Sequence, residues 1–112
     1  MNLTPTEEQE QRALVEYLDC RNLKYTAIPN STFTPYKTTK MRNTRMWVRP
    51  WFPDIVVLVK WHFIAIELKR KKWWTVSRYQ KEWIAELNKC NWVEAYVAYW
   101  ADEAIKIIES KF

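Results

Sequence analysis

The 112-residue sequence contains no glycine, a single histidine and two cysteines. Without glycine it cannot form the glycine-rich loops that hold phosphate groups in many nucleotide-binding proteins, so any phosphate must be held in another way. Cys20 and Cys90 are isolated and His62 is the only histidine, so the sequence supports neither a disulfide framework nor a zinc site. We expect two buried or half-buried free thiols.

Long apolar runs are also missing. No stretch reaches the roughly 20 residues that cross a bilayer, and Met1 is followed by polar residues rather than by the apolar core of a signal peptide. The chain is 48% hydrophobic and 28% charged, and its length suits one globular domain over residues 1–112. We therefore expect a cytoplasmic protein with no membrane partner and no small-molecule cofactor.

Acidic residues are absent between Cys20 and Pro53, although the whole chain has a net charge of only +5. The basic residues in this stretch are Arg21, Lys24, Lys37, Lys40, Arg42, Arg45 and Arg49. Positive charge gathered in one segment indicates a polyanionic partner, because it attracts phosphate groups. The alternative is that these side chains are simply solvated on a loop.

Capping motifs and apolar periodicity predict seven elements. Thr4-Pro5-Thr6-Glu7 and Ser77-Arg78-Tyr79-Gln80 both have the spacing of a capping box at the start of a helix. The expected helices cover about 5–21, 77–90 and 101–108, and the expected strands cover 24–29, 54–59, 62–69 and 93–99. This order, α, β, β, β, α, β, α, predicts an α/β fold of the α+β type, with helices packed on a mixed sheet.

Two acidic residues bracket the predicted hairpin. If Lys60-Trp61 closes a tight turn, Val59 faces His62, and the same register places Asp54 opposite Glu67 on one face. Directly opposed like charges are destabilising, so a cation between them is expected. Oxygen ligands without nearby histidine or cysteine favour Mg²⁺ or Mn²⁺. The alternative is that Pro53-Asp54 is an ordinary turn entering one strand, and that Glu67 and Lys69 form the solvent-exposed end of the other.

The sequence "FPD", twelve intervening residues and then "ELK" resembles the PD-(D/E)XK nuclease superfamily. The segments "EEQEQRALVEYL", "IPN", "RPWFPDIVVL", "IAIELKRKK" and "SRYQKEW" follow one another in an order similar to that of the VRR-NUC family, particularly its small stand-alone members from phages and bacteria. The resemblance spans nearly the whole chain. It implies a restriction-endonuclease-like core and metal-dependent cleavage of DNA.

The resemblance also implies roles for individual residues. Asp54 and Glu67 would be metal ligands together with the backbone carbonyl of Leu68, and Lys69 would be the catalytic lysine. Gln80 would support the site from the second helix.

A glutamate of the first helix completes the site in the family. Glu7 and Glu10 compete for this role because they lie on nearly one face of the helix. Glu10 is the predicted catalytic residue and metal ligand, since Glu7 already fits the capping box.

DNA is the partner that the resemblance implies, and branched or flapped DNA and a homodimer are plausible because small relatives act as resolvase-like dimers. The predicted backbone contacts are Lys37, Lys40, Arg42, Arg45, Arg49, Arg70, Lys71 and Lys72, of which the last three could equally form a solvated turn. The function is then a structure-selective endonuclease that nicks DNA or resolves Holliday junctions. The alternatives are a non-catalytic nucleic-acid-binding module and a restriction-type nuclease.

Tryptophan stands where such proteins usually carry glycine. The seven positions are Trp47, Trp51, Trp61, Trp73, Trp74, Trp92 and Trp100. Tight hairpin loops and helix C-caps need positive φ, which glycine adopts easily and a bulky residue does not. We therefore expect left-handed backbone at Trp61 and Trp92. Glycine could have been replaced by design or through a codon read as tryptophan; the alternative is that the indoles form a base-stacking surface.

Overall fold

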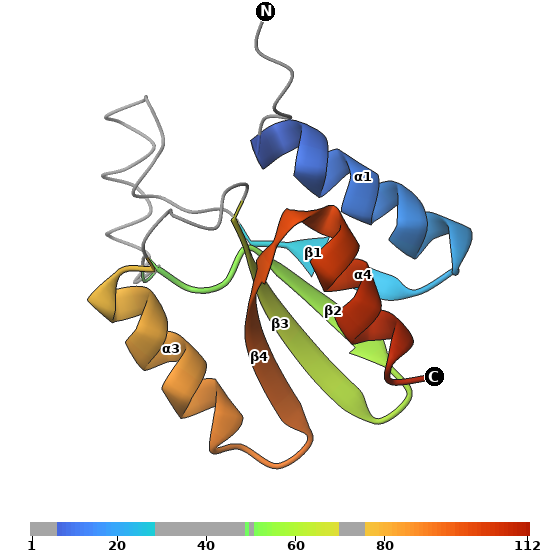
Figure 1. Cartoon of the computed structure of the whole chain (residues 1–112). Helices are drawn as coiled ribbons and strands as arrows, with labels where there is room; N and C mark the ends of the chain where they lie inside the picture. The colour runs from blue at the N-terminus through green and yellow to red at the C-terminus, as the bar shows by residue number, and fades with distance from the viewer. Residues whose placement is uncertain (1–6, 29–48, 50, 70–75) are drawn as a thin grey trace, which may run out of the picture.

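The computed structural model describes residues 7–28, 49, 51–69 and 76–112 (Figure 1). Its elements are α1 (Glu7–Cys20), β1 (Lys24–Ala27), β2 (Ile55–Val59), β3 (His62–Lys69), α3 (Arg78–Asn88), β4 (Val93–Tyr99) and α4 (Trp100–Glu109). The predicted order and the mixed α+β class are confirmed. Among the described helices, none is both long and apolar enough to cross a membrane.

The four strands form one sheet in the order β1-β2-β3-β4. Strands β1, β2 and β3 pair antiparallel, whereas β4 pairs parallel to β3 because α3 carries the chain back between them. Figure 1 shows α1 and α4 on one face of the sheet and α3 on the other. Asn88, at the end of α3, ties this helix to β4 because its amide bonds both the N–H (2.9 Å) and the C=O (3.1 Å) of Ala95.

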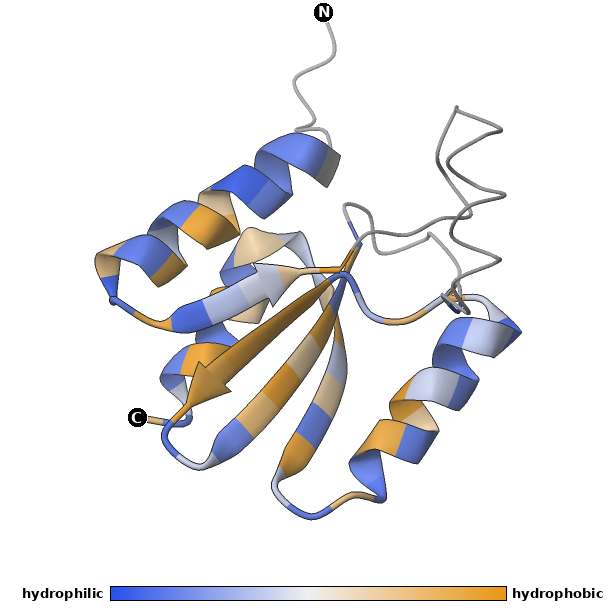
Figure 2. Cartoon of the chain, turned by 180° about the vertical axis from the view of Figure 1, so that it is seen from behind, coloured by the Kyte–Doolittle hydropathy of each residue, from blue (hydrophilic) through white to orange (hydrophobic). Residues whose placement is uncertain are grey.

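Alternating residues of the strands fill two cores. One core packs Ile64, Ile66 and other aliphatic side chains of the sheet against α1 and α4. The smaller core packs Val56, Ala65 and Ala95 against α3. Figure 2 shows the apolar residues concentrated on β2 and β3 in the middle of the sheet. Residues of β3 with odd numbers, including Glu67, therefore face α3.

The hairpin register is the predicted one. Val59 pairs with His62, and the ladder ends at Ile55 opposite Ile66. Asp54 comes directly before the last pair and Glu67 directly after it. Both acids therefore lie at the end of the hairpin farthest from its turn.

The backbone is left-handed at three of the tryptophans, namely Trp51 (φ 75°), Trp92 (φ 66°) and Trp100 (φ 71°). The expectation for Trp61 is wrong, because Lys60, the first residue of the hairpin loop, has the positive φ (53°) instead. Tryptophans 47, 73 and 74 lie outside the described residues.

The structure also bears on the cysteines, the start of the last helix and the cap of the first helix. The cysteines are free as expected, but both are exposed rather than buried. The last helix begins at Trp100, slightly earlier than predicted. The predicted cap of the first helix falls on residues outside the described part.

Candidate active site

Asp54 is held at the entrance to β2 by the neighbouring strand. Its Oδ2 accepts a hydrogen bond of 2.9 Å from the backbone N–H of Leu68, and its own carbonyl accepts one of 2.8 Å from the N–H of Ile28. These bonds fix the carboxylate beside the C-terminal part of β3. The sequence predicted the register that places Asp54 and Glu67 at one end of the hairpin, but not the bond to Leu68.

Glu67 is almost completely buried, with 3% of its surface exposed. Its Oε1 accepts a hydrogen bond of 2.7 Å from Nε2 of Gln80 and lies 3.4 Å from Nζ of Lys69. A buried carboxylate costs several kcal/mol unless charge and hydrogen bonds compensate it. Lys69, also largely buried, supplies that charge.

The position of Gln80 follows from the capping box of α3. The Gln80 N–H donates to Oγ of Ser77 (3.1 Å), and Oε1 of Gln80 accepts from the Ser77 N–H (3.0 Å). Because Oε1 is used by the cap, Nε2 is the atom that points to Glu67. The sequence predicted the capping box, and the same motif also orients the amide in the site.

These residues lie on a fold that is known from solved structures. No protein-family model matches the sequence, and no curated protein matches it. A solved VRR_NUC domain protein aligns with 100% of this chain and 90% of its own, at 22% sequence identity and a TM-score of 0.76. The chain has the VRR-NUC fold. At this identity the likeness concerns the fold, so the chemistry depends on the residues themselves.

Within the VRR-NUC fold, the donor set suits a hard divalent cation. Asp54 and Glu67 place two carboxylates at one end of the hairpin, and carboxylate oxygens are the ligands that Mg²⁺ and Mn²⁺ prefer. The described residues contain no group of three or more histidine, cysteine, aspartate or glutamate side chains that could hold a metal. A cation here would therefore also need backbone or water oxygens.

Glu10, the predicted third carboxylate ligand of the metal ion, bonds instead to the backbone of α4. Its Oε2 accepts a hydrogen bond of 2.7 Å from the backbone N–H of Ala101, in the first turn of α4. The carboxylate thus caps α4, and its role as a metal ligand stays a prediction. The side chain of Glu7, the competing candidate, lies outside the described part.

Most of the predicted DNA contacts lie outside the described residues. They are Lys37, Lys40, Arg42, Arg45, Arg70, Lys71 and Lys72. Arg49 is exposed and, with Trp51 and Tyr79, lines a hollow along α3. Their role in DNA binding stays a prediction.

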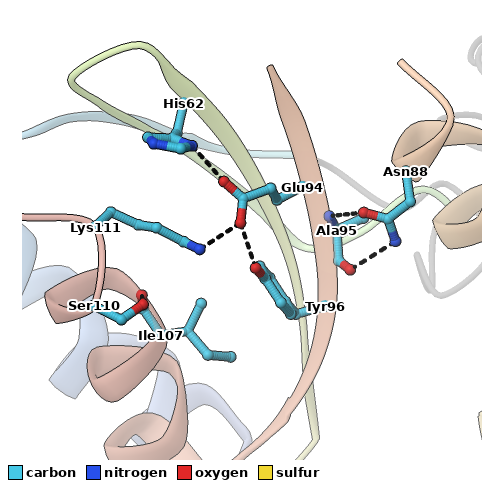
Figure 3. Close-up of polar contacts among 8 residues, drawn as sticks. All are labelled: His62, Asn88, Glu94, Ala95, Tyr96, Ile107, Ser110 and Lys111. Atoms are coloured by element: carbon cyan, nitrogen blue, oxygen red, sulfur yellow. Dashed lines mark hydrogen bonds and ion pairs between the residues drawn. The ribbon is translucent and has the colours of Figure 1, made fainter. Parts of the chain in front are cut away.

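A second polar cluster lies at the other end of the sheet (Figure 3). Glu94, near the start of β4, contacts His62, Tyr96 and Lys111. Burial alone would raise the pKa of Glu94, but its hydrogen bonds with Lys111, Tyr96 and His62 lower the pKa below its usual value. This cluster joins the C-terminus to the sheet and is separate from the carboxylates at Asp54 and Glu67.

Proposed function

We propose that this protein is a Mg²⁺- or Mn²⁺-dependent endonuclease that hydrolyses phosphodiester bonds in DNA. One observation carries the proposal: a buried Glu67, compensated by Lys69 and Gln80, lies at the same end of the β2–β3 hairpin as Asp54, on a VRR-NUC fold. Burying an acid and a lysine together is costly to stability, and such clusters occur preferentially at functional sites.

Each residue has a distinct task in this proposal. Asp54 and Glu67 would hold the cation, with the Leu68 carbonyl and Glu10 as further candidate ligands. The cation would polarise the scissile phosphate and activate water for attack. Lys69, whose ammonium lies beside Glu67, would stabilise the negative charge that develops on the phosphate. Gln80 would keep the Glu67 carboxylate in a fixed orientation.

The finer parts of the proposal concern substrate and assembly. We propose flapped or branched DNA, including Holliday junctions, as the substrate, and a homodimer acting in the cytoplasm. The basic residues of 37–49 and 70–72 would contact the DNA backbone, which positions the strand without reading its sequence.

The test uses variants of similar size that each remove one charge. Asp54→Asn keeps an oxygen for the Leu68 N–H, Glu67→Gln keeps an oxygen for Gln80, and Lys69→Met keeps most of the apolar stem. Each should lower the rate of cleavage of linear, flapped or four-way-junction DNA at least about 100-fold, which is typical of lost electrostatic stabilisation. Glu8→Gln, an exposed acid of α1, is the matched control.

Cleavage must require Mg²⁺ or Mn²⁺ and stop with EDTA. Binding without cleavage under these conditions would instead support the non-catalytic module. Cleavage by the Lys69→Met variant at the parent rate would show that the site is wrongly assigned.

A further inference from the structure

A hollow of about 610 Å³ lies between α3 and the segment that leads into Asp54. It is lined by Arg49, Trp51, Tyr79, Glu82, Trp83 and Glu86. The two segments that line it also build the site, because position 51 is three residues before Asp54, and Tyr79 and Trp83 flank Gln80 in α3. The volume is within the range of pockets that bind small organic groups, about 300–1,000 Å³.

Aromatic rings form the walls of this hollow. Tyr79 and Trp83 are four residues apart and so share one face of α3. Trp51 stacks on Tyr79 with ring centroids 5.9 Å apart and an interplanar angle of 22°, and Phe52 meets Trp83 edge-on at 5.2 Å. Tyr79 is still 56% exposed, so ring surface is available to a further planar group. Tyr79 and Trp83 would still line the hollow if position 51 carried glycine instead of tryptophan.

The charges around the hollow suit an anionic strand. Glu82 pairs with Arg78 at 3.1 Å, and Glu86 pairs with Lys89 at 2.9 Å. These basic partners offset both acids, so among the described residues Arg49 leaves the rim with a net positive charge. A guanidinium can bond a phosphate through two N–H groups at once.

We propose that this hollow binds one unpaired nucleobase of a DNA strand whose neighbouring phosphate lies at Asp54 and Glu67. The inference rests on the proposed function and narrows its substrate class. A paired base would first have to leave the duplex at a cost of a few kcal/mol, whereas a base in a flap, gap or junction would not. The hollow would therefore favour cleavage next to unpaired nucleotides.

The test measures DNA affinity in Ca²⁺, which can offset the two carboxylates that face the phosphate. Ca²⁺ is larger than Mg²⁺ and has a less regular coordination geometry, so binding is measured with little cleavage. A single abasic residue is moved along a flapped oligonucleotide, one position at a time. We expect one position at which loss of the base weakens binding about 5- to 150-fold, as for lost stacking of one base. In Tyr79→Ala, intact DNA should bind correspondingly more weakly, and the abasic residue should cause no further loss.

Two controls separate stacking from folding. Tyr79→Phe keeps the aromatic ring, so the loss of affinity at the abasic position should remain. Trp61→Ala removes an 85% exposed indole at the hairpin turn and should also leave this loss of affinity unchanged. Equal affinity at every abasic position, or an abasic effect that persists in Tyr79→Ala, would overturn the inference. A flat abasic profile with metal-dependent cleavage intact would refute only this inference, whereas a clear abasic effect without cleavage would refute only the proposed activity.

Discussion

Replacing Trp92 by glycine should stabilise the protein. Trp92 has a left-handed backbone (φ 66°), and its side chain is 70% exposed, so the indole contributes little burial. A side chain in this conformation costs roughly 1–2 kcal/mol, and glycine removes that strain. Glycine also gives the unfolded chain more freedom, which offsets about 0.4–1 kcal/mol of the gain. The net increase in the free energy of unfolding is about 1 kcal/mol, or about 4 °C in Tm for a domain of this size.

Thermal unfolding of four variants tests this reasoning. Trp92→Ala is the matched control, because it removes the indole but keeps the Cβ atom that causes the strain, so it should melt below Trp92→Gly. Trp61→Gly should not be stabilised, since residue 61 lacks positive φ, whereas Lys60→Gly should be. A Trp92→Gly protein that melts at or below Trp92→Ala would refute the strain argument.

The same experiment bears on the origin of the tryptophans. A base-stacking role predicts weaker binding of single-stranded DNA by Trp92→Gly, by about 1–3 kcal/mol for an indole in contact, with little change in Tm. If tryptophan has instead replaced glycine at this position, Trp92→Gly should have a higher Tm and unchanged binding of single-stranded DNA. The gene offers an independent check. One codon type at the seven positions and a different codon at Trp83 would support a glycine codon read as tryptophan.

Three further predictions concern other parts of the chain. Glu10→Ala should lower the free energy of unfolding by about 0.5–2 kcal/mol in denaturant titrations, because the first turn of α4 loses its cap; an unchanged value would mean that this bond is not formed in solution. Glu94→Gln should lower the free energy of unfolding at neutral pH. The difference in stability between the variant and the parent should vanish as the pH falls through the lowered pKa of Glu94, because the side chain at position 94 is then uncharged in both proteins. A difference in stability that persists at low pH would contradict the charge effect. Changing Arg42 and Arg45 to alanine should weaken binding to all DNAs similarly and reduce the salt dependence of affinity by a slope of about 1 per lost contact; an unchanged slope would place the DNA elsewhere.

The parts of the fold that could be predicted depend on local patterns. The Ser77 to Gln80 spacing predicted the start of α3, and the two-residue loop at Lys60 fixed the register that brings Asp54 near Glu67. The pattern could not tell which residue of that loop takes positive φ, because both positions are compatible with a tight turn.

Local sequence patterns could not predict contacts between segments that are far apart in the chain. The bond from Ala101 to Glu10 joins residues 91 positions apart, and only the packing of α1 on α4 brings them together. Helical periodicity narrowed the candidates to one face of α1, but it could not show that Glu10 already has a partner. The hollow beside α3 was missed for the same reason, although the spacing of Tyr79 and Trp83 was a usable signal.

The two hydrogen bonds of the Gln80 side chain limit what evolution can place there. Capping boxes generally accept either glutamate or glutamine at this position. Here glutamate would satisfy the Ser77 N–H equally well but would set a second carboxylate against the buried Glu67, where Nε2 now donates. Relatives with the same arrangement should therefore keep glutamine, and a change to glutamate should be found only together with a compensating change at position 67.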